Sequence, residues 1–313
     1  MEMSSTPRRA IAAACPCGSG LSYRLCHQSV AEAAPHKYID VARRQYAEAW
    51  AGNAAHYTAQ GLYVWLAQAL YDHLPAGRTA AQVDLIDIGC GRGDGLVAQR
   101  ILLGGRVGRL IGIDENSACL AAAADRLGLR ASDVGLRVRH RMLGDRAHDL
   151  YYDVDHLPTP ARLALVHSDL LRRDHKLVDA LGAGVFDAIT LWFTGTHKAR
   201  EHDVLVKARG LHSDELYGIA LECEAFAFAA AHLRPGGVFQ IASRGAHADL
   251  ARIREAFRGK MLAMVEGVPL SLIDLQLRRY SEPDQGRRLA VNSSRFDACP
   301  LTTGVVSAIF RRH

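Results

Sequence analysis

The amino-acid sequence predicts an α/β fold built on a sheet of mainly parallel strands. Three observations lead to this prediction. The apolar run at 83–88 is followed by glycines at alternate positions and then by a segment compatible with a helix. A second apolar run at 110–114 ends in a carboxylate. Two further apolar runs, at 163–170 and 186–193, have the length and composition of buried strands.

The glycine-rich turn after the first strand has the composition of a ligand-binding loop. Asp87 lies near the end of the strand, and Gly89, Gly91 and Gly93 follow. Glycine lets the backbone turn sharply and lets a ligand approach without obstruction by a Cβ atom. The start of the next helix offers free N–H groups to an anionic group. The segment therefore predicts a loop for a nucleotide-type cofactor.

The spacing of these glycines separates two kinds of cofactor. The dinucleotide pattern G-x-G-x-x-G is not met, because its third glycine position holds Asp94 or Leu96, depending on the starting glycine. The pattern present is D-x-G-x-G-x-G from Asp87 to Gly93. This resembles motif I of the class I S-adenosylmethionine-dependent methyltransferases, and the order of the later strands resembles that family as well.

The resemblance implies a Rossmann-like sheet of seven strands in which the last strand, within 304–312, is antiparallel. It also implies that Asp114 accepts hydrogen bonds from the two ribose hydroxyls and that Asp169 contacts the adenine amino group. The segment Leu233–Gly237 matches the turn that precedes the fifth strand in the family. The implied cofactor-binding residues are Asp87, Gly89, Gly91, Gly93, Asp114, Asp169, Leu170 and Trp192.

Three cysteines and a histidine near the N-terminus form a second motif. Cys15, Cys17, Cys26 and His27 have the spacing C-x-C, eight residues, then C-H. Three thiolates and one imidazole make a closed tetrahedral zinc site, so we expect a structural zinc ion and not a catalytic one. The motif resembles the SEC-C zinc motif of the bacterial preprotein translocase ATPase. The knuckle either contacts a partner or only stabilises the chain.

The chain is expected to have three parts. Residues 1–30 contain a flexible tail and the zinc knuckle, 31–77 form a helical cap, and 78–313 form the class I methyltransferase domain with an insertion near 132–160. The cap is rich in Tyr and Trp, and we expect its helices to be interrupted near Gly52 and Gly61. Tyr57 is the cap residue predicted to reach the acceptor pocket.

The segment at the end of the fourth predicted strand contains the candidate residues for the methyl acceptor. The Asn/Asp-Pro-Pro-Tyr signature of enzymes that methylate amino groups of DNA or protein glutamine is replaced by LWFTGTH at 191–197. His197 is the candidate general base for a hydroxyl, carboxylate or imidazole acceptor. Trp192 and Phe193 are expected to present an aromatic wall to the cationic sulfonium or the substrate.

Composition limits the class of protein. The chain has 313 residues, of which 49% are hydrophobic, and its formal charge is +5. The arginines are spread along the sequence, which is compatible with nucleic-acid contact without arguing for it. The seven cysteines argue against a disulfide framework, and we expect a cytoplasmic location because the sequence shows neither a secretory pattern nor a membrane-spanning run.

These features predict an S-adenosylmethionine-dependent methyltransferase that acts on an oxygen or nitrogen of a small molecule. Three alternatives remain open. The acceptor is an RNA or a protein docked by the zinc knuckle, the cofactor is used for a transfer other than methylation, or the domain is a binding protein without activity. The intact glycine motif and both acids argue against the last alternative. The sequence leaves the acceptor atom and the oligomeric state undetermined.

Overall fold

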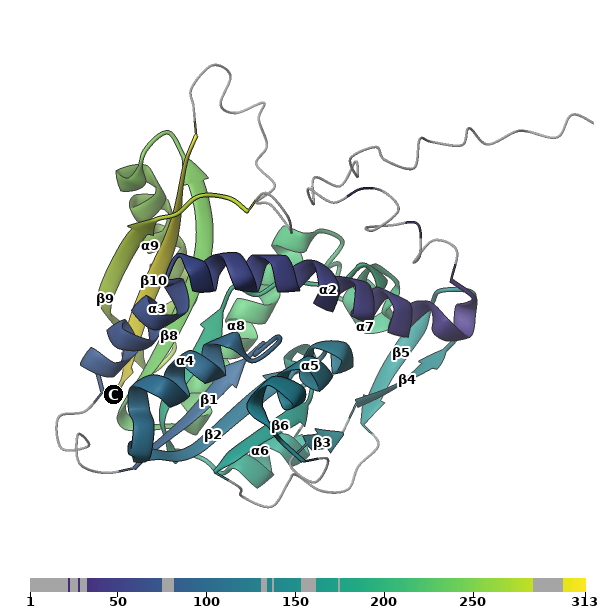
Figure 1. The fold of residues 1–313 in the computed structure, drawn as a ribbon, viewed down its shortest axis with the longest axis horizontal. Helices are drawn as coiled ribbons and strands as arrows, with labels where there is room; N and C mark the ends of the chain where they lie inside the picture. The colour runs from purple at the N-terminus through teal and green to yellow at the C-terminus, as the bar shows by residue number, and fades with distance from the viewer. Residues whose placement is uncertain are drawn as a thin grey trace, which may run out of the picture.

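The computed structural model describes residues 22, 28, 33–74, 82–130, 134–136, 138–152, 162–173, 175–283 and 301–313 (Figure 1). The four residues of the predicted zinc motif, Cys15, Cys17, Cys26 and His27, lie outside these described residues. Within the described part of the chain, no helix has the length and apolar character needed to cross a membrane.

Among the described residues, a sheet of eight strands forms the centre of the molecule, in the order β3-β6-β2-β1-β7-β8-β10-β9. The strands are β1 (Val83–Ile88), β2 (Val107–Asp114), β3 (Val134–Leu136), β6 (Leu163–His167), β7 (Phe186–Trp192), β8 (Leu233–His247), β9 (Leu270–Arg279) and β10 (Thr302–Arg312). Strand β10 runs antiparallel to both of its neighbours, whereas the pairs from β3 to β8 are parallel. The predicted Rossmann-like α/β sheet of seven strands with an antiparallel last strand is confirmed, and β3 extends it at one edge.

The start of β8 differs from the prediction. We expected Leu233–Gly237 to form a turn before the strand, but β8 already begins at Leu233. Leu233 pairs with Phe186, and the register shifts before Val238 pairs with Ala188. The Pro-Gly-Gly segment therefore lies within the strand as an irregularity, and regular pairing resumes at Val238.

The two faces of the sheet are covered by different helices, as the alternation of side chains along a strand requires. Leu85 of β1 packs in a cluster with α4 (Asp94–Leu103) and α5 (Ser117–Leu127). Ile86 packs on the opposite face in a cluster with α6 (His175–Leu181), α8 (Asp214–His232) and α9 (Leu250–Val265). Because the core strands are buried on both faces, the helices hold the carboxyl ends of β1, β2, β6 and β7 in a fixed arrangement.

The N-terminal helices lie on the side of the sheet that carries α4 and α5. Helix α2 (Tyr38–Ala59) follows the short η2 (Pro35–Lys37) and contacts α5, and α3 (Leu62–Asp72) contacts α4. In Figure 1, α2 extends from α3 to the region of β4 and β5, across the molecule. A left-handed Gly61 separates α2 from α3, as predicted.

The expected interruption near Gly52 is wrong, because α2 continues through it. A glycine inside a helix costs about 1 kcal/mol relative to alanine, which packing can offset. The neighbouring Asn53 is fully buried and donates a hydrogen bond to the Tyr57 hydroxyl at 3.2 Å. Packing of this part of α2 against the domain therefore outweighs the local preference.

Residues within 132–160 add a second, two-stranded sheet. Strands β4 (Val138–Met142) and β5 (His148–Tyr152) pair antiparallel. His148 is fully buried and forms an isolated parallel bridge with Asp203. Asp203 precedes α7 (Val204–Ala208) and follows η7 (Lys198–His202). The hairpin is thereby attached to the segment that follows β7.

Candidate functional site

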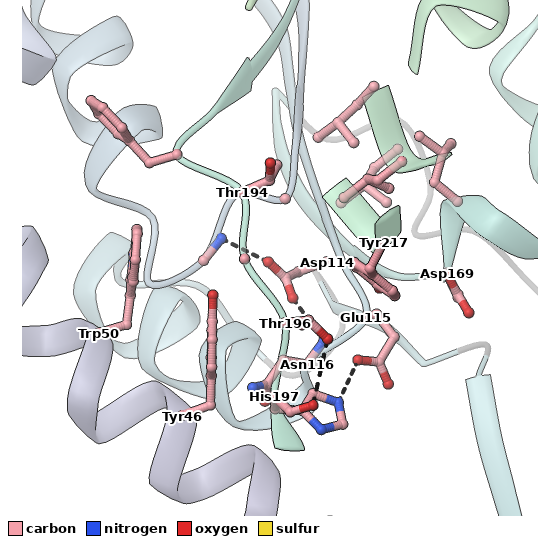
Figure 2. Close-up of a pocket in the computed structure, with 18 of the residues that line it drawn as sticks. Tyr46, Trp50, Asp114, Glu115, Asn116, Asp169, Thr194, Thr196, His197 and Tyr217 are labelled. Atoms are coloured by element: carbon pink, nitrogen blue, oxygen red, sulfur yellow. Dashed lines mark hydrogen bonds and ion pairs between the residues drawn. The ribbon is translucent and has the colours of Figure 1, made fainter. Parts of the chain in front are cut away.

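A cavity lies at the carboxyl ends of β1, β2, β6 and β7, bounded by residues of α2 (Figure 2). This is the position at which the strand order reverses between β1 and β7, where open α/β sheets bind ligands. Its lining combines glycines, carboxylates and aromatic side chains: Tyr46, Trp50, Ile88, Gly89, Gly91, Ile113, Asp114, Glu115, Asn116, Ser168, Asp169, Leu170, Phe193, Thr194, Gly195, Thr196, His197, Tyr217 and Leu221.

The glycine turn after β1 forms one wall of the cavity. Gly89 and Gly91 line it, and both have positive φ angles, of 65° and 55°. Gly93, with a φ of 80°, is the N-cap of α4 and lies outside the lining. A Cβ atom on Gly93 would approach the Cβ of Ala123 to 3.2 Å. Two of the three glycines thus face the cavity, and the third allows close packing of α4 on α5.

Asp87 lies beneath this turn and outside the lining of the cavity. Its Oδ1 accepts a hydrogen bond from the Thr190 hydroxyl at 2.6 Å. Burial raises the pKa of Asp87 to about 7, although the Thr190 hydrogen bond opposes this shift. The side chain joins β1 to β7 at the base of the loop.

Asp114 ends β2 and lines the cavity. Its Oδ2 accepts a hydrogen bond from the backbone N–H of Gly91 at 2.8 Å, and its Oδ1 accepts one from the N–H of Asn116 at 2.7 Å. Burial raises the pKa of this carboxyl to about 6, and the two N–H groups act in the opposite direction. Asp114 therefore connects the glycine turn to the start of α5 while facing the cavity.

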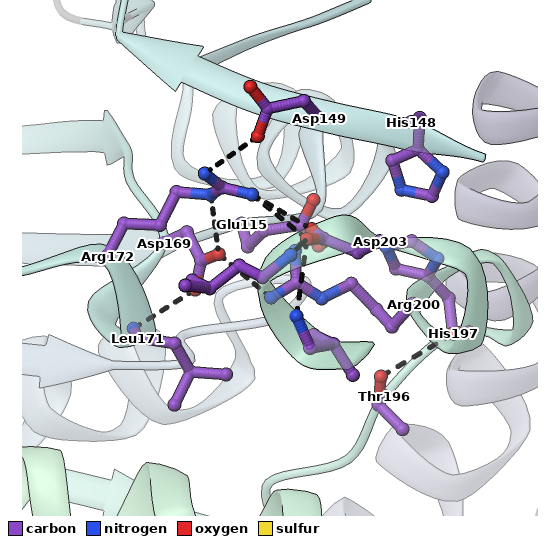
Figure 3. Close-up of polar contacts among 12 residues, drawn as sticks. Glu115, His148, Asp149, Asp169, Leu171, Arg172, Thr196, His197, Arg200 and Asp203 are labelled. Atoms are coloured by element: carbon purple, nitrogen blue, oxygen red, sulfur yellow. Dashed lines mark hydrogen bonds and ion pairs between the residues drawn. The ribbon is translucent and has the colours of Figure 1, made fainter. Parts of the chain in front are cut away.

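Asp169 follows β6 and belongs to a buried network of charges (Figure 3). Its Oδ2 accepts a hydrogen bond from Arg200 at 2.8 Å, and its Oδ1 accepts one from the N–H of Leu171 in η6 (Leu170–Arg172) at 3.1 Å. Arg200 and Arg172 also bond to Asp203, at 2.8 and 2.9 Å. Pairing of these carboxylates with the arginines offsets the free-energy cost of removing their charges from water. Leu170, next in the chain, lines the cavity.

His197 lines the cavity in the loop after β7 and is 4% exposed. Its Nε2 lies 2.8 Å from Oε2 of Glu115, so Nε2 is the nitrogen that donates (Figure 2). Burial lowers the pKa of His197, although the Glu115 carboxylate opposes the shift. Burial would raise the pKa of Glu115, but Arg43 and His197 outweigh it and hold that pKa well below its usual range.

Arg43, Glu115 and Asn116 belong to the site but were not predicted from the sequence. Arg43 forms an ion pair with Glu115, and its backbone carbonyl accepts a hydrogen bond from the Asn116 side chain at 3.0 Å. Asn116 also caps α5 by accepting from the N–H groups of Ala118 and Cys119. An Asn directly before a helical segment is a sequence signal for an N-cap, so the capping role of Asn116 could have been predicted. The pairing of Arg43 with Glu115 has no local signal, because 72 positions separate the two residues.

Aromatic side chains of α2 reach the cavity. The Tyr46 and Trp50 rings are stacked, with centroids 6.1 Å apart and an interplanar angle of 4°. A Cβ atom on Gly195 would lie 2.5 Å from the Tyr46 hydroxyl oxygen, so only glycine fits at this position without a shift of Tyr46. The contact places the helix directly against the loop after β7.

Two aromatic residues singled out from the sequence lie behind the cavity. Tyr57 is fully buried and packs on Phe193, with centroids 4.7 Å apart, and only Phe193 reaches the lining. Trp192 donates a hydrogen bond from Nε1 to Oε1 of Gln240 at 3.1 Å and also lies outside the lining. Phe193 lies just beyond the end of β7 and has a positive φ of 54°. Both Trp192 and Phe193 pack on Tyr63, but only Phe193 also lines the cavity.

Comparison with known proteins identifies one sequence family. Residues 13–29 match the SEC-C motif, which confirms the predicted resemblance at the N-terminus. No match was found among curated proteins.

Methyltransferases are among the solved structures with some likeness to this chain. They include geranyl diphosphate C-methyltransferase from Streptomyces coelicolor A3(2), with 14% identity and a TM-score of 0.40 over 79% of this chain and 76% of that one. The methyltransferase domain of bacterial CtHen1-C has 15% identity and a TM-score of 0.42 over 80% and 97% of the two chains. A 16S rRNA adenine-N1 methyltransferase from Catenulisporales acidiphilia has 15% identity and a TM-score of 0.39 over 76% and 89%.

Proposed function

We propose that the protein is an S-adenosylmethionine-dependent methyltransferase whose cofactor binds in the cavity beneath α2. One observation carries the proposal. The turn containing Gly89 and Gly91 and the carboxylate of Asp114 line the same cavity at the reversal of strand order, and they are joined by a hydrogen bond of 2.8 Å. This is the combination that a nucleoside with a charged extension requires.

The residues of the cavity fit such a cofactor. Gly89 and Gly91 leave space along the loop for the methionyl part, because neither carries a Cβ atom. Asp114 accepts only, so it suits the two donors of a ribose diol. The base would lie toward Asp169 and Leu170 at the end of β6. Asp87, Gly93 and Trp192 would support this site from outside the cavity. When bound, the cofactor supplies a methyl group on a positively charged sulfur.

We propose a small molecule as the methyl acceptor. The support for this choice is the aromatic character of the wall made by Tyr46, Trp50, Phe193 and Tyr217, since pockets for small ligands are lined largely by apolar and aromatic groups. His197 is the group that would accept a proton from a hydroxyl or N–H acceptor, and its lowered pKa keeps it neutral at neutral pH. We assign Tyr57 the role of supporting Phe193 from behind.

A macromolecular acceptor is the second candidate. The observation that favours it is the SEC-C match at 13–29. In this case Cys15, Cys17, Cys26 and His27 would hold a structural zinc ion, because three thiolates and one imidazole complete a tetrahedral set, and the knuckle would dock an RNA or a protein.

Incubation of the purified protein with methyl-labelled S-adenosylmethionine and a cell lysate, followed by separation by molecular size, tests both candidates. Label among small molecules would support the first acceptor class, and label on RNA or protein would support the second. If no fraction acquires label while S-adenosylhomocysteine binds to the protein, methyl transfer to components of that lysate is contradicted.

A further inference from the structure

Ser168 is a polar residue of the cavity that the resemblance to methyltransferases does not assign. It lies between the end of β6 and η6, is 2% exposed, and belongs to the lining of the cavity. Its backbone N–H donates to the carbonyl oxygen of Asp114 at 3.0 Å. Its Oγ has no hydrogen-bond partner among the residues that the structure describes. Buried hydroxyls are almost always paired, so an unpaired one in a ligand cavity points to a ligand group.

The neighbouring Asp169 is in the opposite situation. Both of its carboxylate oxygens accept hydrogen bonds from within the protein, one from Leu171 and one from Arg200 (Figure 3). The Nε of Arg172 lies 3.5 Å from Oδ2 as well. The charge of Asp169 is thus neutralised by arginines, and its geometry is fixed by η6.

The strand order shows which part of a nucleoside cofactor would meet Ser168. Strand β2 lies between β1 and β6, so Asp114 at the end of β2 lies between the glycine turn and Ser168. If the ribose is held at Asp114 and the amino-acid part lies along the glycine turn, the base extends toward the end of β6.

We infer that the hydroxyl of Ser168 forms the side-chain hydrogen bond to the adenine base, and that Asp169 is a positioning residue that holds Arg200 and η6. This inference rests on the proposed function and names a binding residue of the same site. A hydroxyl donates and accepts, so it pairs with either a ring nitrogen or the amino group of adenine.

Calorimetric titration with S-adenosylhomocysteine, combined with thermal unfolding of the free protein, tests the assignment. Ser168→Ala is expected to raise the Kd about tenfold, the usual effect of losing one neutral hydrogen bond. The Tm of the free protein should stay unchanged or rise, because the variant removes an unpaired buried hydroxyl. Ser168→Cys keeps a side chain of similar size with a weaker donor and should also bind less tightly.

Ser307→Ala provides the matched control. Ser307 lies on the distant strand β10 and is also fully buried, but its Oγ accepts a hydrogen bond from the Gln240 side chain at 2.8 Å. This variant should lower the Tm and leave the Kd unchanged. Asp169→Asn should likewise lower the Tm, since it weakens the pairing of the buried Arg200, and should change the Kd less than Ser168→Ala does.

Two results would overturn the assignment and are distinguishable. If Ser168→Ala binds S-adenosylhomocysteine as tightly as the wild-type protein does, the inference fails and the proposed function stands. If the wild-type protein binds no S-adenosylhomocysteine, the proposed function fails and the inference fails with it.

Discussion

The carboxylate of Glu115 joins His197 to helix α2. Oε2 accepts a hydrogen bond from Nε2 of His197 at 2.8 Å, and Oε1 pairs with the guanidinium of Arg43. All three side chains are largely buried. Because Nε2 carries the proton, Nδ1 of His197 has a free lone pair, and it has no hydrogen-bond partner within the described part of the chain. The position of the helix and the tautomer of the candidate base therefore depend on the same carboxylate.

Glu115→Gln should destabilise the protein. The variant keeps a hydrogen-bond acceptor for His197 but leaves the buried Arg43 without a countercharge, and loss of one member of a buried pair costs about 3 kcal/mol. Urea unfolding at pH 7 measures this change. Glu255→Gln is the control, because Glu255 forms an exposed ion pair with Arg252 and should change the free energy of unfolding by less than about 0.5 kcal/mol. Equal stability of the Glu115 variant and the wild type would show that the pair contributes nothing.

Because of His148, the free energy of unfolding should decrease as the pH falls below about 6.5. Burial lowers its pKa from 6.5 to about 4, while the hydrogen bond with the Arg146 carbonyl opposes the shift. The unfolded chain therefore binds a proton more tightly than the folded one does. The contribution of His148 is fully present above pH 6.5 and is lost as the pH falls toward 4, by up to about 3 kcal/mol.

His148→Gln should reduce this pH dependence, since it removes the titrating ring and retains an amide that can donate to the same carbonyl. Urea unfolding of both proteins at several values between pH 7.5 and 4.5 gives the two slopes. His197 still titrates in the variant and leaves a residual slope of the same sign. Parallel slopes for the two proteins would contradict the buried, neutral state of His148.

Gly195→Ala should disturb the contact between α2 and the loop after β7. The new Cβ atom would lie 2.5 Å from the Tyr46 hydroxyl oxygen, and overpacking of this kind costs about 1–3 kcal/mol. Tyr46→Phe removes the obstructing oxygen, so the double variant should recover part of the loss. A double-mutant cycle of thermal unfolding measures the coupling energy. Strictly additive effects of the two substitutions on the free energy of unfolding would show that positions 46 and 195 are not in contact in solution.

The local parts of the fold were accessible from the sequence, and the contacts between distant segments were not. Strand β1, the glycine turn and α4 are continuous in the chain, so alternation and glycine spacing identify them. The three-residue β3 is too short for periodicity to identify. Gly52 was expected to interrupt a helix, and its tertiary surroundings keep it helical.

The same distinction holds in the site. Asp114 follows a strand directly and could be found from its position. The Arg43–Glu115 and Tyr46–Gly195 contacts bring α2 to residues far along the chain, which no local pattern encodes. The placement of Tyr57 behind Phe193 depends on the rotation of α2 about its axis, and the approximate periodicity of its apolar residues did not determine that rotation.

Calorimetric titration of the wild type and Asp114→Ala with S-adenosylhomocysteine tests the central claim most directly. Asp125→Ala, which changes an exposed carboxylate of α5, is the control. We predict that the wild type and the control bind with the same Kd. The Asp114 variant should bind at least about tenfold more weakly, because charge-assisted hydrogen bonds to a ribose diol are each worth about 1.5–3 kcal/mol. Equal affinity of all three proteins, or absence of binding to the wild type, would contradict the proposed cofactor site.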